Sequence, residues 1–282
     1  MFKRVLIANR GEIACRVIQT LRRLGIESVA VYSEADAGAR HVRHADRAIE
    51  IGPAQASRSY LDGARLIAAA RECGAEAIHP GYGFLSENAG FARQCEEAGI
   101  AFIGPRADTI DVMGSKIASK RLMSEAGVPT VPGYHGDDQS PETLTREAQR
   151  IGFPLLVKAS AGGGGKGMRV VHTPAEHDAG LTGAAREAQS AFGDSKVLLE
   201  KFLLAPRHIE FQMFGDTHGN HVHLFERECS IQRRYQKIIE EAPSPFLDET
   251  TRRAMGEQSC ALAKAVGYRS AGSVEVFVDG ER

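Results

Sequence analysis

A run of glycines directly after a lysine is the most informative chemical feature of the sequence. The run is Lys158-Ala159-Ser160-Ala161-Gly162-Gly163-Gly164-Gly165-Lys166-Gly167-Met168. Successive glycines let backbone N–H groups turn toward polyphosphate oxygens, and Lys158 can add a point charge. The run is not a Walker A loop, because Lys166 is followed by Gly167 rather than by Ser or Thr. It therefore predicts a phosphate-binding loop. A flexible glycine linker is the alternative, and the strands expected on both sides argue against it.

A second candidate site combines a polar strand face with a basic cluster. His208, Glu210 and Gln212 alternate with apolar residues, so their side chains share one face of a predicted strand. A cluster of basic and amide side chains follows within six residues: Gln232, Arg233, Arg234 and Lys237. Such a face can bind an anion such as bicarbonate or phosphate. A solvated polar face is the alternative.

Two other segments carry candidate ligand contacts. Glu275 lies on an otherwise apolar strand, which predicts a buried carboxylate and a possible magnesium ligand, with a position at the rim as the alternative. The segment 79–88, His-Pro-Gly-Tyr-Gly-Phe-Leu-Ser-Glu-Asn, follows a predicted parallel strand, at the edge where such folds bind ligands. A structural turn with Ser86 as the cap of the next helix explains that segment equally well.

The elements that position these residues begin with a strand–helix alternation. Short apolar strands are predicted at 5–8, 29–32, 77–79 and 101–103, with helices near 13–24, 60–73 and 89–98. This repetition predicts a doubly wound α/β domain over residues 1–112. The first turn, Asn9-Arg10-Gly11-Glu12, lacks the GxGxxG fingerprint, so dinucleotide binding is unsupported.

The rest of the chain divides into a helical linker and two smaller units. The linker, 113–130, contains a helix at 116–125, and the Pro/Gly-rich connector 128–133 marks the boundary with the next unit. Residues 131–203 form an α+β unit with strands at 155–158, 168–171 and 197–199. A capping box at Thr173 and Glu176 predicts the start of a helix in this unit, and we expect the helix to end near Phe192. Residues 204–282 begin another unit, with a hairpin at 209–225, a helix at 250–266 and a strand at 273–278. Asp279-Gly280 is a hairpin turn with no returning strand, so we expect a truncated domain.

Composition and charge exclude several classes of protein. The 282 residues carry a formal net charge of -1, which gives no reason to expect nucleic acid or an anionic membrane as a partner. The five cysteines are scattered without a CxxC pair, so neither a disulfide framework nor a zinc site is indicated. No apolar run is long enough to span a membrane, and Met1 lies too close to the first strand for a leader peptide. We expect a cytoplasmic protein.

Several segments in a fixed order resemble biotin carboxylases over essentially the whole chain. The matching segments are 7–14 (Ile-Ala-Asn-Arg-Gly-Glu-Ile-Ala), 79–88, Lys158 with its glycine loop, Glu200-Lys201, 206–210 (Pro-Arg-His-Ile-Glu) and 232–243, from Gln232 through Lys237 to Pro243. The connector 134–139, Tyr-His-Gly-Asp-Asp-Gln, resembles that of acyl-CoA carboxylase α-chains, in particular the 3-methylcrotonyl-CoA type. The resemblance implies an ATP-grasp fold, with an N-terminal doubly wound domain, a mobile α+β lid and an incomplete C-terminal ATP-grasp domain.

The resemblance also assigns expected roles to individual residues. Lys237 faces the bicarbonate or the transferred phosphoryl group, Glu275 is a magnesium-binding glutamate, and Tyr82 and Gly83 border the biotin pocket. Arg16 matches a residue of the family's dimer interface. The expected ATP-binding residues are Lys116, Lys158, Gly163, Gly164, Gly165, Lys166, Gly167, Met168, Glu200, Lys201, Leu203, His208 and Gln232.

The implied reaction is the ATP-dependent carboxylation of carrier-bound biotin. Bicarbonate attacks the γ-phosphoryl group of ATP, with Mg²⁺ or Mn²⁺ as the metal, and the resulting carboxyphosphate yields carbon dioxide for a ureido nitrogen of biotin. The implied partners are a biotinylated carrier domain, a carboxyltransferase subunit and a second copy bound through the N-terminal domain. Tyr235 departs from the family, in which many members have a histidine that contacts the ribose. Further metal, bicarbonate and biotin contacts of the family lie beyond residue 282, so we expect the 282 residues alone to be nearly inactive.

Two rival functions remain from the sequence. Another ATP-grasp ligase, such as a carbamoyl-phosphate synthetase or a purine-pathway ligase, shares the lid chemistry, but the segments 79–88 and 232–243 argue against it. A non-catalytic chain that binds ATP or dimerises through its first domain is the alternative from a different class.

Overall fold

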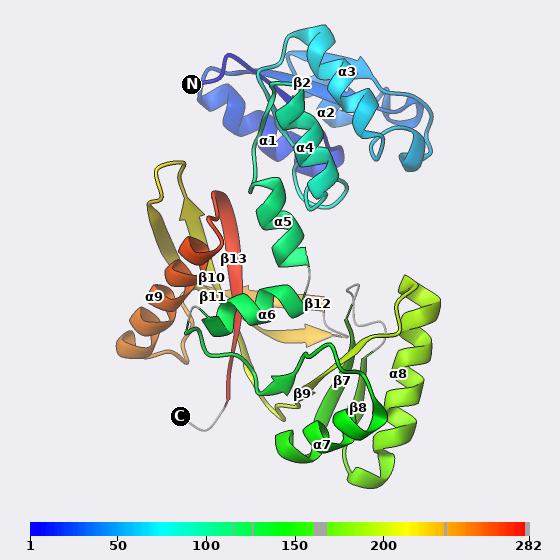
Figure 1. Ribbon diagram of the computed structural model, residues 1–282. Coiled ribbons are helices and arrows are strands. Elements are labelled where there is room, and N and C mark those ends of the chain that lie inside the picture. Colours follow the sequence, from blue (N-terminus) through cyan, green and yellow to red (C-terminus); the bar gives the residue numbers. More distant parts are fainter. Residues whose placement is uncertain (115, 126, 161–167, 234–235, 280–282) are drawn as a thin grey trace. The chain divides into compact units, whose positions relative to one another are not determined.

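The computed structural model describes residues 1–114, 116–125, 127–160, 168–233 and 236–279 (Figure 1). The side chains of Lys116, Ile117 and Phe192 lie outside this description. The chain divides into two compact units, namely residues 1–111 with 268–270, and the remainder. No helix among the described residues combines the length and the apolar character needed to cross a lipid bilayer.

The first unit is built on a parallel sheet with the strand order β3-β2-β1-β4-β5, which confirms the predicted doubly wound domain. Its strands are β1 (Arg4–Ile7), β2 (Glu27–Tyr32), β3 (Arg47–Glu50), β4 (Ala77–His79) and β5 (Ala101–Phe102). Its helices are α1 (Gly11–Arg23), α2 (Arg40–His44), α3 (Gly63–Cys73) and α4 (Ala89–Glu97), and α5 (Ala107–Gly114) follows them.

Side chains of β1 alternate between the two faces of this sheet. Val5 and Ile7 pack with the apolar face of α1, whereas Leu6 packs with α3 and α4. The strand order reverses at β1, so the loops after β1 and β4 meet at the carboxyl edge. There the Asn9 side-chain amide donates to the carbonyl oxygens of Pro80 at 2.9 Å and of Tyr82 at 3.0 Å.

The second unit contains two antiparallel sheets. The lid sheet has the order β6-β9-β7-β8, and the C-terminal sheet has the order β12-β11-β10-β13. The lid sheet consists of β6 (Gly133–Tyr134), β7 (Leu155–Ala159), β8 (Met168–Val171) and β9 (Val197–Lys201), with helices α7 (Pro141–Ile151) and α8 (His177–Phe192). The C-terminal sheet consists of β10 (Arg207–Gly215), β11 (His221–Arg233), β12 (Gln236–Glu241) and β13 (Ser270–Val278), with helix α9 (Glu249–Ala265). Helix α6 (Lys116–Glu125) precedes both sheets.

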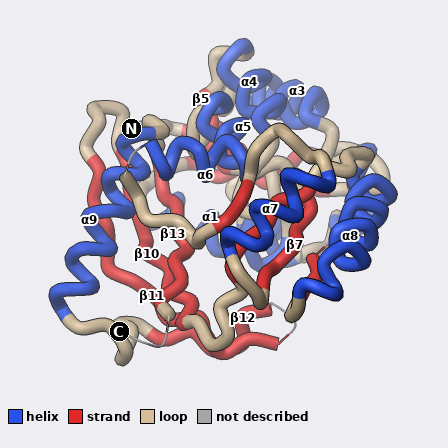
Figure 2. The backbone as a smooth tube through the Cα atoms, turned by 60° about the horizontal axis from the view of Figure 1, so that its bottom comes forward, coloured by secondary structure: helices blue, strands red, loops and turns tan. Residues whose placement is uncertain are grey.

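Each antiparallel sheet has one face covered by helices. In the lid sheet, Leu155, Val157 and Leu199 pack against α7 and α8, which run beside β7 in Figure 2. In the C-terminal sheet, Ile209 and Phe211 pack with residues of α9 and of the segment before it. Because side chains alternate along a strand, the intervening residues point to the opposite faces.

Three local features differ from the predictions. The strand β3 was not predicted, because Arg47–Glu50 is a mostly exposed edge strand with little apolar content. Asn88 rather than Ser86 caps α4, and its side-chain oxygen accepts from the Phe91 N–H at 2.8 Å. The Thr173 side chain makes no capping bond, whereas the Glu176 carboxylate accepts from the backbone N–H of His172 at 2.9 Å. A short 3₁₀ turn, 174–176, therefore precedes α8, whose end at Phe192 agrees with the prediction.

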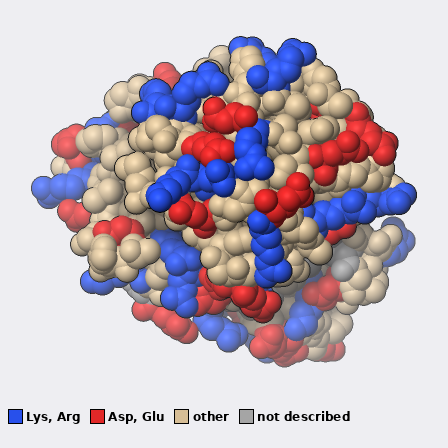
Figure 3. Space-filling model, turned by 90° about the horizontal axis from the view of Figure 1, so that it is seen from above, with Lys and Arg blue, Asp and Glu red and all other residues tan. Residues whose placement is uncertain are grey.

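Charged side chains of both signs lie on one face of the molecule (Figure 3). On the face drawn in Figure 3, basic and acidic side chains are interspersed, and neither sign forms a continuous area. This agrees with the net charge of -1.

Candidate functional site

The open face of the lid sheet carries the predicted phosphate-facing residues. Lys158 lies opposite Met168 on β8 and opposite Leu198 on β9, and Leu156 lies opposite Glu200. Residues opposite one another in an antiparallel pair share a face, so Lys158, Met168 and Glu200 all point away from the helices. The alternation that buries Val157 under α7 and α8 therefore fixes Lys158 on the open side.

A cavity of about 590 Å³ lies within the second unit. Nine of the residues predicted as site residues line it: Lys158, Met168, Glu200, Lys201, Leu203, His208, Gln232, Lys237 and Glu275. Apolar side chains complete the wall: Val131, Leu156, Phe202, Leu204, Pro206 and Phe277, together with the hydroxyl of Ser230. A concave apolar site with a few convergent polar groups suits a nucleotide-sized ligand.

A buried carboxylate holds two lysines at the lid side of this cavity. Glu200 is 6% exposed, and its two carboxylate oxygens form ion pairs with the ammonium groups of Lys158 and Lys120. Burial alone would raise the pKa of the Glu200 carboxyl, but the charges of Lys158 and Lys120 outweigh it and hold the pKa below its ordinary value. Lys120, on α6, was not predicted as a site residue.

The strand end at Lys201 offers its main chain rather than its side chain. The Lys201 ammonium group donates to the carbonyl oxygens of Gly152 at 3.3 Å and of Phe153 at 2.9 Å. The Lys201 N–H donates to the Pro132 carbonyl at 2.8 Å. Because proline has no N–H, Pro132 cannot return a bond to the Lys201 carbonyl. The Lys201 carbonyl, on a strand that borders the cavity, therefore receives no hydrogen bond from the backbone of residue 132.

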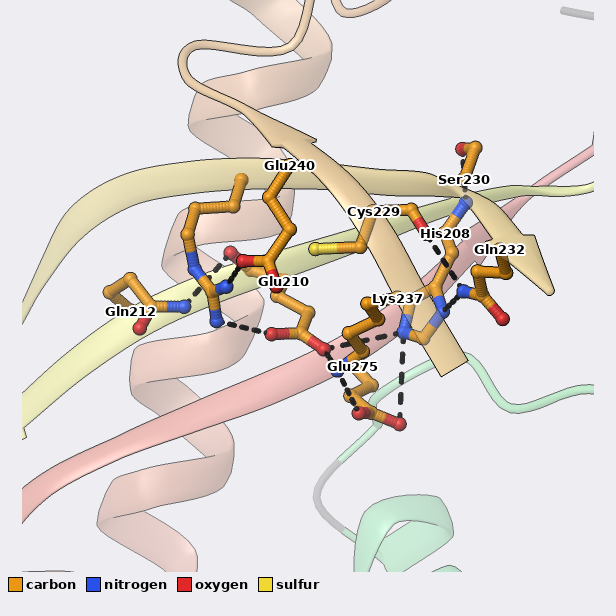
Figure 4. A network of polar contacts seen from close by, with 10 residues as sticks. His208, Glu210, Gln212, Cys229, Ser230, Gln232, Lys237, Glu240 and Glu275 are labelled. Carbon is orange, nitrogen blue, oxygen red and sulfur yellow. Dashed lines mark hydrogen bonds and ion pairs between the residues drawn. The ribbon is translucent and has the colours of Figure 1, made fainter. Parts of the chain in front are cut away.

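The C-terminal sheet holds a second carboxylate between two cations (Figure 4). Glu210 is 1% exposed and lies directly opposite Arg227 across the β10–β11 ladder, with which it forms an ion pair at 2.5 Å. The ammonium group of Lys237 also pairs with Glu210, and it lies 3.0 Å from the Glu275 carboxylate. Arg227 pairs in addition with Glu240 of β12.

His208 is fixed by the neighbouring strand. Its backbone N–H donates to the Ser230 hydroxyl at 2.9 Å, and its Nδ1 lies 2.7 Å from the Gln232 amide nitrogen. Burial lowers the pKa of the His208 imidazole below its ordinary value; the charge of Glu275 opposes this shift, and the charge of Lys237 adds to it. The neutral imidazole is the favoured form near pH 7.

A group of three residues, two of which line the cavity, could hold a metal ion. The ligand atoms of His208, Glu210 and Glu275 lie within 4.8 Å of one another, and this is the one such group found among the described residues. Mg²⁺ prefers carboxylate oxygens, and Glu275 offers one at the cavity wall. The prediction that Glu275 is buried is wrong, because its side chain is 54% exposed. The residue lies at the rim, with its carboxylate toward Lys237 and His208.

The remaining predicted residues lie in the first unit or outside the description. Tyr82, 58% exposed, and Gly83 follow β4 in the loop that Asn9 holds. Arg16 lies on α1, where it lines a surface hollow together with Gln19, Arg22 and Arg23 of the same helix. Gly163, Gly164, Gly165, Lys166, Gly167, Tyr235 and the Lys116 side chain lie outside the described residues.

Two family descriptions match the chain. Residues 1–110 match the N-terminal domain of biotin carboxylase, and residues 115–282 match the ATP binding domain of the carbamoyl-phosphate synthase L chain. The chain belongs to the biotin carboxylase family. Its fold is therefore the ATP-grasp fold of biotin carboxylases, with a parallel sheet followed by two antiparallel sheets.

Curated relatives of this biotin carboxylase chain are subunits of larger enzymes. It is 58% identical to the mitochondrial methylcrotonoyl-CoA carboxylase subunit alpha of Dictyostelium discoideum, over 99% of this chain and 40% of that protein. It is 56% identical to the propionyl-CoA carboxylase alpha chain of Ruegeria pomeroyi, over 100% of this chain and 41% of that protein. The chain thus spans about two fifths of these relatives.

Solved structures of biotin carboxylases share the fold closely. The complex of the Campylobacter jejuni biotin carboxylase with β-γ-ATP has a TM-score of 0.94 and 46% identity, over 99% of this chain and 63% of that one. The biotin carboxylase domain of the Hydrogenobacter thermophilus 2-oxoglutarate carboxylase, in complex with MgADP and bicarbonate, has a TM-score of 0.92 and 52% identity, over 100% and 62%.

Proposed function

We propose that the chain binds MgATP in the cavity of its second unit, as the nucleotide-binding part of a biotin carboxylase. In the complete site, bicarbonate attacks the γ-phosphoryl group to give carboxyphosphate and ADP. Carboxyphosphate then breaks down to phosphate and carbon dioxide, which a ureido nitrogen of carrier-bound biotin captures. The observation that carries the proposal is the gathering of Lys158, Glu200, His208, Lys237 and Glu275 on one cavity.

The base of the nucleotide would lie against the apolar wall near Leu203. The Lys201 carbonyl can accept from an exocyclic amine, because Pro132 leaves it without a ladder bond from that residue. The Leu203 main chain borders the same wall and can supply the neighbouring donor. The triphosphate would then reach Lys158, together with Lys116 and the glycine loop 163–167.

The far end of the cavity would hold the reacting groups. Lys237 is the proposed contact for bicarbonate and the transferred phosphoryl group, and His208 and Gln232 border the phosphates. Glu275 is the proposed ligand of Mg²⁺ or Mn²⁺. When bound, the metal neutralises negative charge on the phosphate oxygens. Tyr82 and Gly83 are proposed to border the biotin pocket.

Calorimetric titration tests nucleotide binding by the chain itself. We expect one site for MgATP, with adenosine binding at least about tenfold more weakly, because only ATP reaches the lysines. Equal affinities for the two ligands, or no binding of MgATP, would contradict the proposal.

Turnover separates the ligase from the non-catalytic alternative. We propose that the 282 residues by themselves release little ADP in response to bicarbonate and biotin, because they cover 62–63% of the solved biotin carboxylase chains. The same assay on a longer chain that spans a whole biotin carboxylase should show bicarbonate-dependent release. Parent-like rates in the 282-residue chain would contradict this part of the proposal.

The domain organisation and the partners follow from the same proposal. We assign residues 1–112 to the N-terminal domain, 113–130 to the linker, 131–203 to the lid and 204–282 to the start of the C-terminal domain. The proposed partners are a biotinylated carrier, a carboxyltransferase subunit and a second copy through the surface around Arg16. A cytoplasmic location stays a prediction, since the Dictyostelium relative is mitochondrial.

A further inference from the structure

The two lysines that share Glu200 occupy different places relative to the cavity. Lys158 lines the cavity from β7, whereas Lys120 comes from α6 and is not among the described residues that line it. Lys120 is nevertheless well covered, with a side-chain exposure of 17%. Both ammonium groups contact the same carboxylate, so one buried anion is held by two cations.

Binding of a triphosphate would change the ion pair that Lys158 makes. An ammonium group that turns to a triphosphate gives up all or part of its contact with Glu200. A buried carboxylate that loses its only partner is strongly destabilised, because desolvation of the charge is no longer offset. Glu200 is 6% exposed, so its carboxylate has little contact with solvent that could replace a lost lysine.

We propose that Lys120 is a resident counter-cation, which keeps Glu200 paired while Lys158 turns to the triphosphate. The inference rests on the proposed function and adds a positioning residue to it. Lys120 does not touch the ligand; it makes the departure of Lys158 from Glu200 energetically acceptable. It thereby increases the share of the binding free energy that comes from the phosphates.

The same arrangement recurs on the C-terminal sheet. Glu210 is paired both with Lys237, which lines the cavity, and with Arg227, which is not among the described residues of its lining. Each cavity lysine therefore shares a buried carboxylate with one cation set back from the cavity. Two independent sheets with the same arrangement argue against a chance contact at Lys120.

The groups around Glu200 define what removal of Lys120 would do. The charged and titratable described groups that face Glu200 are Lys158 from β7, Lys120 from α6 and His135 from the segment after β6. Burial lowers the pKa of His135, and Lys120 lowers it further, so its imidazole does not replace a lost lysine near pH 7. Without Lys120, a triphosphate that draws Lys158 away leaves Glu200 or His135 to take up a proton.

Titration calorimetry on the 282-residue chain tests this with MgATP and adenosine as probes. In Lys120→Met we expect the ratio of ATP to adenosine affinity to fall by roughly tenfold or more. We also expect proton uptake on ATP binding, seen as a heat that depends on the ionisation enthalpy of the buffer. Lys120→Arg keeps the cation and should retain the wild-type ratio. Arg121→Met removes an exposed cation of the same helix and serves as the matched control.

A double variant separates charge balance from folding. Lys120→Met with Glu200→Gln removes the cation together with its buried anion, so it should recover most of the lost ratio. An unchanged ratio without proton uptake in Lys120→Met would overturn the role of Lys120, while a loss of ATP binding in Lys158→Met would still support the proposed function. Equal affinities of the wild-type chain for ATP and adenosine would overturn the proposed function, and this inference with it.

Discussion

The two sheets that border the cavity hold their lysines in the same way but carry opposite charge balances. On the lid side, Lys158 of β7 and Lys120 of α6 pair with one carboxylate, Glu200 of β9. On the C-terminal sheet, two cations pair with three carboxylates: Lys237 and Arg227 with Glu210, Glu240 and Glu275. Burial favours the neutral form of the nearby His208. The lid side has an excess cation for an anionic ligand, whereas the other side has an excess carboxylate for a divalent cation.

The two faces also differ in regularity. The β7–β9 ladder keeps one register from Leu155 to Ala159, so strict alternation decides where Lys158 points. The β10–β11 ladder shifts between Phe211 and Met213, and the β11–β12 ladder shifts on either side of Ile231. Such irregularities re-aim side chains near functional sites. A regular strand thus presents one lysine, and an irregular sheet gathers several groups around another.

Loss of the two cavity lysines should affect ATP binding unequally. We expect Lys158→Met to weaken MgATP binding by roughly 100-fold, and Lys237→Met by roughly tenfold, when bicarbonate is absent. Lys158 belongs to the side with excess positive charge, whereas Lys237 is already held by two carboxylates. Calorimetry with MgATP measures both losses, and adenosine affinity should change in neither variant. A larger loss for Lys237→Met would reverse the comparison.

The dependence of ATP affinity on Mg²⁺ should come from residues of the C-terminal sheet. We expect Glu275→Gln to reduce the gain in ATP affinity that Mg²⁺ gives by about tenfold, because it removes the carboxylate at the cavity rim. Glu200→Gln should leave that gain unchanged, since Glu200 is occupied by two lysines. Titrations with and without chelator measure the gain. If Glu200→Gln also lost the Mg²⁺-dependent gain in ATP affinity, the lid sheet and the C-terminal sheet would not differ in this respect, and the prediction would be wrong.

Acid should release the lid-side ion pairs. The pKa of Glu200 lies below its ordinary value, so its pairs stabilise the fold above that ordinary value, near 4.5, and the stabilisation is lost as the pH falls through the folded-state pKa. Glu200→Gln should flatten the dependence of the free energy of unfolding on pH in this acid range, because the variant has no carboxyl group to protonate there. Urea unfolding at several pH values measures it, with the exposed Glu142→Gln as the control. The same slope in wild type and Glu200→Gln would contradict the assignment.

A smaller effect is expected where the base would lie. Pro132→Ala supplies an N–H that can bond the Lys201 carbonyl and compete with the ligand for it. We expect adenosine and ATP affinities to fall together by about threefold, since neither phosphates nor lysines are involved. A change in the ratio of the two affinities would show that the carbonyl does not serve the base.

The sequence was sufficient where local pattern decides position. The alternation around Glu210 predicted a shared face for His208 and Glu210 that the structure confirms, because a period of two fixes which side chains lie on the same side of a strand. The βαβ repetition predicted the parallel sheet, apart from the polar edge strand β3.

The sequence was insufficient where tertiary contacts decide. Nothing in the local pattern of α6 distinguishes Lys120, which pairs with a strand 80 residues later, from its exposed neighbour Arg121. Glu275 was predicted to be buried from its apolar neighbours, yet it lies at the sheet edge formed by β13 and is half exposed. Asn88 rather than Ser86 is the cap because α4 begins at Ala89, directly after Asn88.

A crystal structure of the chain with Mg²⁺ and a non-hydrolysable ATP analogue tests the central claim most directly. We predict the triphosphate between the lid sheet and the C-terminal sheet, with the Lys158 ammonium on a phosphate oxygen and Lys120 still on Glu200. A nucleotide bound elsewhere, or Lys158 still paired with Glu200 beside an occupied cavity, would contradict the account.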